Sequence, residues 1–507
     1  MPIVEIPLGE WLPDSPSFKN PGCEVADNVI PAPGGYRPFN SAFTTGSSGS
    51  GFSSGFSSGF SGGTGAADFA SSVVKGARQL FDNSGNSVLV GGLDDGLFIR
   101  RAVLTETGGL TSIGDGEAWD FAQFNDFVIA TGGSNAPQYL SDIDSDDTWS
   151  ALGGSPPNAK RCAKVGDFLM LGHVAGVPNR IQWSAFNNPT GAWAASRLTQ
   201  AGSADLPTEF GGVQRIVGGR YATVFQQRGI MRLSYVGPPV VWRADTVSAD
   251  RGTTAPFSVV NIGYFSFFLA QDGFYVTNGT SVDPIGTQRI NRWFFENVAQ
   301  SRIKEVHGAI DWQNECIVWA FHGQESTEYN RFLIYSYAQN RWSTATTIVN
   351  WVVSSTLDGI DIDSLDAVYS NLDNISLSLD SDEFKAKDRR LAAFIPSGSL
   401  SLYATFTGDP LEATWETGEF QPSPGRRVHA SEIWPVMEAA NWDSKMTLLM
   451  RGNRGQRTTS AEKAAGWAGF APVRGEGQKM AVRWVKPSGT WDEAQGIQVR
   501  FRPSGFR

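Results

Sequence analysis

The chain has 507 residues and a formal net charge of −10, and it contains 57 Gly, 26 Pro, 17 Trp and 32 Phe. This composition is typical of a turn-rich β protein with room for two or more domains, and it argues against a helical bundle. No apolar run approaches the ~18 residues of a membrane span, and Met1–Trp11 lacks the basic residues of a signal peptide. We therefore expect a soluble protein that is made in a cytoplasm and is not stably inserted in a membrane.

Residues 1–45 contain eight prolines, which leave little room for a helix. They predict an extended arm that lies against its own body or against a neighbouring subunit. Residues 46–66 repeat glycine and serine around Phe52, Phe56 and Phe60. This composition favours a flexible linker, but regularly spaced phenyl rings are unusual in one. Two interpretations stay open: incidental aromatic residues, or a loop that contacts a partner or exposes its rings in a channel.

Residues 67–383 repeat a short hairpin pattern, in which two apolar runs flank a polar turn. The first runs start 39 to 54 residues apart. The pairs are Val88–Val90 with Leu97–Ile99, Phe127–Ala130 with Gln138–Leu140, Phe168–Leu171 with Arg180–Trp183, Ala222–Phe225 with Ile230–Leu233, Phe265–Leu269 with Phe274–Thr277, Cys316–Phe321 with Phe332–Ser336, and Ala367–Ser370 with Ile375–Leu379. A period of about 40–50 residues is that of a four-stranded propeller blade. We predict a β-propeller of six to seven blades, which the N-terminal segment could help to close; the alternative is a β-sandwich array with coincidental spacing.

Several repeats end on a tryptophan in a turn-rich context, notably Trp149, Trp193 and Trp342. Such a large ring can pack between neighbouring blades and bury area that a small residue could not. Trp242 and Trp293 keep the spacing in different local contexts. These positions support the propeller without identifying any chemistry.

Residues 384–507 change period and predict a separate, β-sandwich-like domain, with strands near Leu400–Phe406, Thr414–Glu419, Met446–Arg451, Met480–Val485 and Ile497–Arg502. Helical periodicity over more than ten residues is hard to find, and the best candidates for short helices are Asn291–Gln300 and Ala461–Ala465. From Gln421 to Arg507 there are 14 Lys and Arg against 7 Asp and Glu, so this basic domain stands on an acidic body. Docking onto acidic neighbours or sister subunits is favoured over nucleic-acid contact.

The sequence offers no constellation of catalytic residues. Its histidines, His173, His307, His322 and His429, have no partner at metal-ligand spacing, and Cys23, Cys162 and Cys316 lie far apart and should be reduced. Eight acidic residues between Asp358 and Glu383 lack the pattern of a calcium loop, and a solvated acidic face is favoured. We predict no enzyme activity, cofactor or metal site, although propellers do host glycosidases that use paired carboxylates.

Two stretches resemble the nozzle (tail-hub or tail-tube B) proteins of short-tailed bacteriophages. The first is Asn20–Pro31, followed by Gly34–Pro38, which is similar to the opening "Asn…Gly…Ala…Asn-Val-Ile-Pro…Gly-Tyr-Arg-Pro" of such proteins. The second runs from Asn179–Ser184 through Asn188-Pro189, Trp193, Val236–Pro239 and Gln271–Tyr275 to Pro284–Gly286. The resemblance covers about Ile3–Gly286 and departs from the family at Phe52–Gly65.

The resemblance implies a virion tail protein with a β-propeller beside other β-rich domains. Its expected partners are five further copies in a homohexameric ring, the portal-adaptor proteins, tail fibres or spikes, and genomic DNA in transit without sequence-specific binding. Residues 1–45 could clamp an adjacent subunit or the adaptor. A wall that repels phosphates would ease DNA transit. The expected luminal or solvent-facing acidic residues are Asp142, Asp144, Asp146, Asp147, Asp358, Asp361, Asp363 and Asp366. The alternative function is a propeller that binds carbohydrate or cleaves glycosides.

Overall fold

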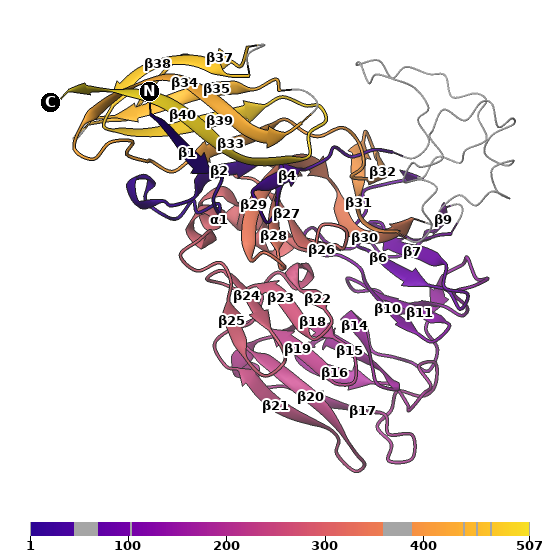
Figure 1. The fold of residues 1–507 in the computed structure, drawn as a ribbon. Coiled ribbons are helices and arrows are strands. Elements are labelled where there is room, and N and C mark those ends of the chain that lie inside the picture. The colour runs from indigo at the N-terminus through magenta and orange to yellow at the C-terminus, as the bar shows by residue number, and fades with distance from the viewer. Residues whose placement is uncertain are drawn as a thin grey trace, which may run out of the picture.

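The computed structural model describes residues 2–44, 69–101, 104–357, 388–439, 442–452, 455–466 and 469–505. Within these residues strands dominate, and they form a β-propeller joined to a C-terminal β-sandwich (Figure 1). Both the all-β class and this architecture confirm the prediction from the sequence.

In the described residues the propeller has seven blades of four antiparallel strands each; six are separate sheets, and the sixth blade is part of a larger sheet. The first six blades use their strands in chain order, from the axis outwards: β6 (Ala77–Phe81), β7 (Ser87–Gly92), β8 (Leu97–Arg100) and β9 (Leu104–Thr107); β10 (Asp120–Phe124), β11 (Phe127–Thr131), β12 (Gln138–Leu140) and β13 (Ser150–Ala151); β14 (Ala159–Val165), β15 (Phe168–Val174), β16 (Val177–Trp183) and β17 (Gly202–Asp205); β18 (Val213–Val217), β19 (Ala222–Gln226), β20 (Ile230–Gly237) and β21 (Val241–Ser248); β22 (Val260–Ile262), β23 (Phe265–Leu269), β24 (Phe274–Thr277) and β25 (Val282–Pro284); β26 (His307–Asp311), β27 (Cys316–His322), β28 (Tyr329–Ser336) and β29 (Arg341–Val349).

The seventh blade closes the ring with strands from both ends of the propeller sequence. It consists of β30 (Trp351–Leu357), β31 (Asp388–Ser397) and β32 (Leu400–Thr405), with β5 (Phe69–Ala70) as its outermost strand. Ala70 pairs with Ser401, and the inner strand β30 lies beside β6 of the first blade. A strand that precedes the first blade therefore completes the last one, and this closure gives seven blades.

Six of the predicted hairpins form the second and third strands of the first six blades. The second strand of a blade is covered on both faces by neighbouring blades, so it reads as a continuous apolar run. Every residue of β27 (Cys316–His322), for example, is buried. The seventh predicted hairpin, Ala367–Ser370 with Ile375–Leu379, lies outside the described residues.

The tryptophans that end the repeats pack between blades, as expected. Trp149 belongs to a buried cluster shared by the first and second blades, and Trp193 to one shared by the second and third. The ring of Trp242 in the fourth blade lies 5.6 Å from that of Phe168 in the third. Trp342 in the sixth blade lies 5.5 Å from Phe274 in the fifth.

The predicted boundary at residue 384 is too early, because β31 and β32 belong to the propeller. β31 is hydrogen-bonded to β30 along its length, and Trp351 pairs with Phe394. The propeller strands thus end at Thr405. The predicted helix at Ala461–Ala465 is also wrong: this segment contains β37 (Lys463–Ala464), which pairs with β35. The expected helix near residue 291 is present as α1 (Asn291–Asn297).

Two sheets form the C-terminal sandwich. One contains β3 (Val29–Pro31), β4 (Tyr36–Pro38), β40 (Glu493–Gly505), β34 (Arg427–Glu438) and β38 (Ala471–Gly477), with β1 (Ile3–Pro7) also paired to β40. The other contains β2 (Cys23–Asp27), β33 (Ala413–Thr417), β39 (Lys479–Lys486), β35 (Lys445–Arg451), β36 (Thr458–Thr459) and β37. Residues of β38 alternate between buried and exposed, as expected for a sheet with one solvated face. In the core, the Trp415 ring packs at a tilt against Trp484 and edge-on against Trp491.

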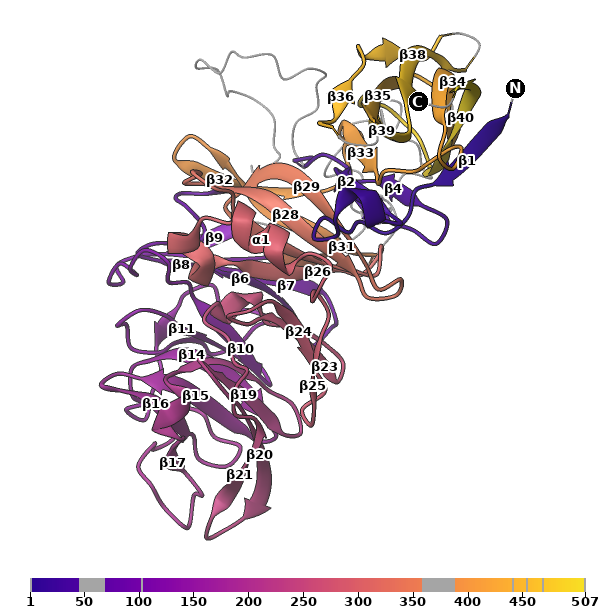
Figure 2. The same ribbon diagram turned by 90° about the vertical axis from the view of Figure 1, so that its left-hand side faces the viewer.

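The N-terminal arm pairs with strands of both domains of its own chain and connects them. Its strand β2 pairs on one side with β33 of the sandwich and on the other with β29 of the sixth blade. A single sheet of ten strands therefore runs from the propeller into the sandwich. The sandwich lies beyond this blade at one end of an elongated molecule (Figure 1 and Figure 2). The sequence predicts an arm that lies against its own body or against a neighbouring subunit, and in the structure it lies against its own body.

Candidate functional site

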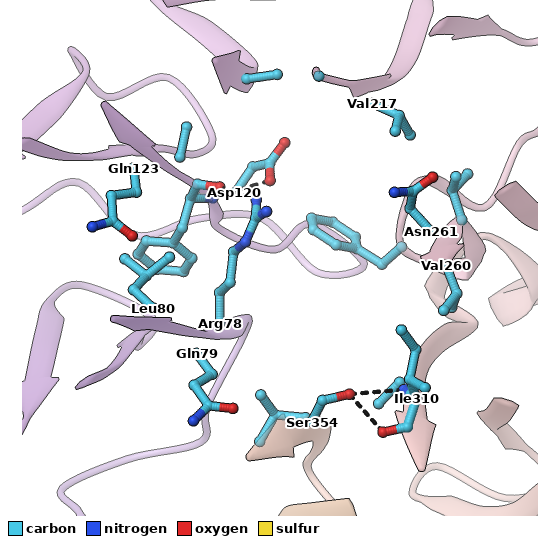
Figure 3. A pocket seen from close by; sticks show the side chains of 18 of the residues that line it. Arg78, Gln79, Leu80, Asp120, Gln123, Val217, Val260, Asn261, Ile310 and Ser354 are labelled. Atoms are coloured by element: carbon cyan, nitrogen blue, oxygen red, sulfur yellow. Dashed lines mark hydrogen bonds between the residues drawn. The ribbon is translucent and has the colours of Figure 1, made fainter. Parts of the chain in front are cut away.

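A cavity of about 840 Å³ lies at the propeller axis. Its walls are the inner strands of the blades, β6, β10, β14, β18, β22, β26 and β30 (Figure 3). Pockets of roughly 300–1,000 Å³ are those that hold small ligands in proteins. The ring of blades thus encloses a space on the scale of a small molecule.

Phe257 closes one end of this cavity. It lies in the short helix η3 (Pro256–Ser258), which Ser258 fixes through Oγ by donating to the Ala255 carbonyl at 2.7 Å and accepting from the Leu269 amide at 3.2 Å. The Phe257 ring is 5.3 Å from the Trp351 ring of the seventh blade. On its other side, the Arg215 guanidinium of the fourth blade lies 5.2 Å from the ring. A ring held between opposite sides of the propeller occupies the axis, so this end is a floor.

Charged side chains from three blades meet just above this floor. Arg215 Nη1 on β18 lies 2.7 Å from Asp120 Oδ1 on β10, and the Asp120 side chain is 2% exposed. The other oxygen, Asp120 Oδ2, accepts from the Cys162 amide at 3.3 Å. Arg78 on β6 donates from Nη1 to the Phe121 carbonyl at 2.6 Å, and Figure 3 shows it close to Asp120. Arg78 is accessible from the cavity but surrounded by protein, and the resulting desolvation, together with the neighbouring Arg215, lowers its pKa.

A third cation, Arg161, lies behind the Phe257 ring. Arg161 on β14 is buried and donates from Nε to the Gln214 carbonyl at 2.6 Å. Its guanidinium lies 4.9 Å from the Phe257 ring, so Arg161 and Arg215 both make cation–π contacts with this phenylalanine. Desolvation lowers the pKa of Arg161 to about 10, which still leaves it charged at neutral pH.

Among the described residues, those at the opposite end of the cavity are exposed and carry positive charge. Here the inner strands reach their last residues, and the exposed lining residues include Phe81, Arg220, Asn261 and Arg389. The Arg389 guanidinium lies 5.4 Å from the Trp312 ring and 5.9 Å from the Phe81 ring. We call this end the mouth. It combines aromatic surface with positive charge.

Among the described residues that line the cavity, Asp120 is the only carboxylate, and it is paired with Arg215. The described lining therefore offers no second carboxylate to share the general acid and base roles that glycoside hydrolysis requires. In the described part of the chain, no cluster of three or more His, Cys, Asp or Glu side chains could hold a metal ion. The geometry of the cavity suits ion recognition better than hydrolysis.

His307, His322 and His173 make structural contacts. His307 stacks on Trp351 at 4.1 Å and accepts from the Val352 amide at Nε2, 3.2 Å away. Burial lowers the pKa of His307 to about 3, so it is neutral. His322 Nε2 lies 3.1 Å from Glu305 Oε2 in a nearby buried pair. The imidazole of His173 contacts the Val213 carbonyl through Nδ1 at 2.9 Å.

The predicted acidic residues Asp142, Asp144, Asp146 and Asp147 form the turn between β12 and β13, on the periphery of the second blade. Their carboxylates mostly cap backbone and side-chain donors of this turn and its neighbours. A hydrogen bond from the Ser145 hydroxyl, with one from the Asp144 amide, lowers the pKa of Asp142. Asp147 forms an ion pair with Arg101 of the first blade. The turn is exposed to partly exposed, and its place on a channel wall stays a prediction.

The remaining predicted site residues, Asp358, Asp361, Asp363 and Asp366 together with Phe52, Phe56 and Phe60, lie outside the described residues. All three cysteines are buried and free, as expected. Among the described residues, no helix has the length and apolar character to cross a membrane.

The cavity residues were not anticipated from the sequence. Arg78, Asp120, Arg215 and Phe257 are separated by whole blades, so no local spacing connects them. The available signal was a charge inside a short strand that begins each repeat, as in β6, β10 and β18. Once the strands are known to line the axis, those charges must converge.

Comparisons with known proteins give no family. No family model matches the chain, and no curated protein is similar in sequence. Among solved structures, the extracellular domain of a one-component system from B. thetaiotaomicron is 10% identical with a TM-score of 0.37, over 79% of this chain and 46% of that one. YCF48 bound to D1 peptide is 9% identical with a TM-score of 0.33, over 57% and 91% of the two chains. Virginiamycin B lyase from Staphylococcus aureus is 9% identical with a TM-score of 0.33, over 56% and 87%. At these scores the likenesses carry no argument about this chain.

Proposed function

We propose that this protein is a structural component of the tail of a short-tailed bacteriophage. In this proposal six copies form a nozzle ring below the portal and adaptor, and the ring provides the channel for DNA ejection and a platform for tail fibres or spikes. The protein is made in the host cytoplasm and resides in the tail of the virion.

The observation that carries the proposal is the position of the residues that resemble nozzle proteins. The segment Asn20–Pro38 forms the joint between propeller and sandwich, where β2 links the ten-stranded sheet and β3 and β4 join the other sheet. One of the two stretches that carry the resemblance therefore lies in the interdomain joint, where paired strands make the connection rigid. This is what a subunit of a load-bearing ring needs.

Individual residues of this segment have conformations and contacts that the joint requires. Asn28 has a φ of 60°, a left-handed conformation that Asn tolerates better than most residues. Its side chain donates to the Glu412 carbonyl at 2.8 Å and accepts from the Thr346 amide at 2.8 Å, so it bridges the propeller to the start of the sandwich. A Cβ on Gly35 would lie 1.9 Å from the Ala494 carbonyl oxygen, so only glycine fits.

Arg341 of the sixth blade fastens the same segment from the propeller side. It donates from Nη1 to the Ala32 carbonyl at 2.9 Å and from Nη2 to the Leu8 carbonyl at 3.2 Å. Its guanidinium also lies 4.9 Å from the ring of Tyr36, which is fully buried and donates to the Gly9 carbonyl. These contacts support a structural role for the segment that carries the resemblance.

The alternative function, glycoside cleavage or carbohydrate binding, has less support. The axial cavity offers one carboxylate, Asp120, already paired with Arg215. Retaining and inverting glycosidases both need two carboxyl groups that flank the scissile bond. Aromatic residues at the mouth could contact a sugar, but they are accompanied by cations.

The assembly state tests the proposal. We expect size-exclusion chromatography with light scattering to give six times the 54.8 kDa of one chain, and negative-stain images to show closed rings. The same preparation should be incubated with bacterial surface polysaccharide as a test for cleavage. A monomer that cleaves saccharide would refute the nozzle and support the alternative.

A ring structure would further test the electrostatic part of the proposal. We expect the channel wall to be acidic or neutral and Asp142–Asp147 to face solvent or the channel, because a basic wall would bind phosphates and slow DNA transit. A strongly basic wall would show that repulsion is not how the channel works.

A further inference from the structure

The axial cavity has an excess of positive charge. Among the residues that the structure describes, its lining includes five cations and a single carboxylate, Asp120, which gives these residues a net charge of +4. The cations are Arg78, Lys164, Arg215, Arg220 and Arg389. This contrasts with the whole chain, whose net charge is −10. A concave site lined by one sign of charge concentrates ions of the opposite sign.

The guanidiniums near the floor retain hydrogen-bonding capacity towards the cavity. A guanidinium has five N–H donors in a fixed fork, and the contacts found for Arg78 and Arg215 occupy one donor each. Arg78 has substantial exposed area although it lies deep in the ring, so its exposed surface faces the cavity. Asp120 can neutralise only one of the cations that surround it. Among the described lining residues, positive charge therefore exceeds negative charge.

Shape limits which anion the cavity can hold. Phe257 closes the floor, and the volume of about 840 Å³ is that of a small-molecule pocket. A continuous polymer cannot pass a closed floor. The fork of an arginine matches the paired oxygens of a phosphate or a carboxylate, and charge-assisted hydrogen bonds of this kind are about twice as strong as neutral ones.

We propose that the axial cavity is a binding site for a small multivalent oxyanion, carried by phosphate groups or by several carboxylates. Arg78 and Arg215 bind the anionic groups near the floor, and Arg389 contacts the part of the ligand that extends to the mouth. The neighbouring cations and the loss of solvation that lower the pKa of Arg78 are both offset when the anion enters. The site is complete in one chain, so it does not depend on ring assembly or on the nozzle proposal.

The test is calorimetric titration of the full-length protein at low salt with two probes, pyrophosphate and tricarballylate. We expect saturable binding of one anion per chain. Binding of pyrophosphate alone identifies a phosphate ligand, and binding of tricarballylate alone identifies a polycarboxylate. If neither probe binds at concentrations on the order of millimolar, the proposal is overturned.

Matched variants locate the binding. Arg78→Met should weaken it by roughly tenfold or more, the scale of a lost charge-assisted hydrogen bond. Arg292→Met is the control, because Arg292 on α1 is exposed and pairs only with Glu296 in its own helix. Asp120→Asn should change affinity in the opposite direction, since it removes the one negative charge. Equal affinities for Arg78→Met and Arg292→Met would overturn the proposal.

A variant at the exposed mouth covers the case in which Arg78→Met fails to fold. Arg389→Met removes a cation that lies near the Trp312 and Phe81 rings. The methionine side chain of the variant can still pack against these rings. We expect weaker binding of the probe with an unchanged unfolding temperature. An unchanged affinity would place the anion outside the cavity and contradict the proposal.

Discussion

The joint between the arm and the propeller can be tested by replacing Arg341 with methionine, which keeps the apolar stem and removes the guanidinium. Three carbonyl contacts are lost, to Ala32, Gly35 and Leu8, together with a cation–π contact to Tyr36. Hydrogen bonds to a charged group contribute about 1.5–3 kcal/mol each. The contact with the Gly35 carbonyl is long, at 3.4 Å. In the variant, the Ala32 and Gly35 carbonyls would still accept hydrogen bonds from the Gly35 and Ala32 amides, respectively. We therefore expect a loss of about 2–4 kcal/mol in the free energy of opening the arm.

Hydrogen exchange followed by mass spectrometry measures this opening directly. Amides of the arm that bond to the body, such as the Asn28 amide to the Thr344 carbonyl, exchange only when the arm detaches. A loss of about 2–4 kcal/mol corresponds to exchange roughly 30- to 700-fold faster in peptides that cover β2 to β4. Arg37→Met, at an exposed position of β4, is the control and should change exchange by no more than about threefold. Equal exchange in the two variants would refute the view that Arg341 fastens the arm.

Three further predictions concern stability. Gly22→Ala should lower the unfolding free energy by more than about 3 kcal/mol, because its Cβ would lie 1.9 Å from the Glu10 carbonyl oxygen, whereas Gly452→Ala, with open space around it, should change it little. Trp193→Ala should cost about 3–5 kcal/mol in urea unfolding, because the 1% exposed ring packs between two blades. The pKa of His307 falls from 6.5 to about 3 on folding, so the contribution of neutral His307 to the free energy of unfolding is full above pH 6.5 and declines as pH falls towards 3. His307→Gln should flatten this decline in a series of urea unfolding curves. An unchanged slope would contradict the lowered pKa of His307.

Much of the propeller could be predicted from the sequence because its hairpins are covered on both faces. Strands such as β15 and β27 are apolar along most of their length and each has a single histidine near its end; a polar turn follows each strand, so the pattern repeats with the blade. The closing strand β5 could not be found in this way, because two residues have no periodicity. Its partner β32 resembled any other strand near the domain boundary, and the predicted boundary was therefore too early.

The residues of the cavity could not be predicted from the sequence, for a different reason. Arg78, Asp120 and Arg215 lie on three blades, and their proximity depends on ring closure, which no local pattern encodes. Phe257 is likewise one phenylalanine among 32 until η3 places it on the axis. The same applies to Arg341 and Tyr36, which meet only because β2 enters the sheet of the sixth blade.

The closed floor also constrains how any ring of these chains could conduct DNA. Since Phe257 occupies the propeller axis, a polymer cannot pass through a single chain, and a passage would have to run between subunits. Arg78 and Arg215, which lie near the floor, would then be inside each propeller and would not lie on the passage wall. A chain with a net charge of −10 can thus hold an anion site on its propeller axis, so the two electrostatic proposals are compatible.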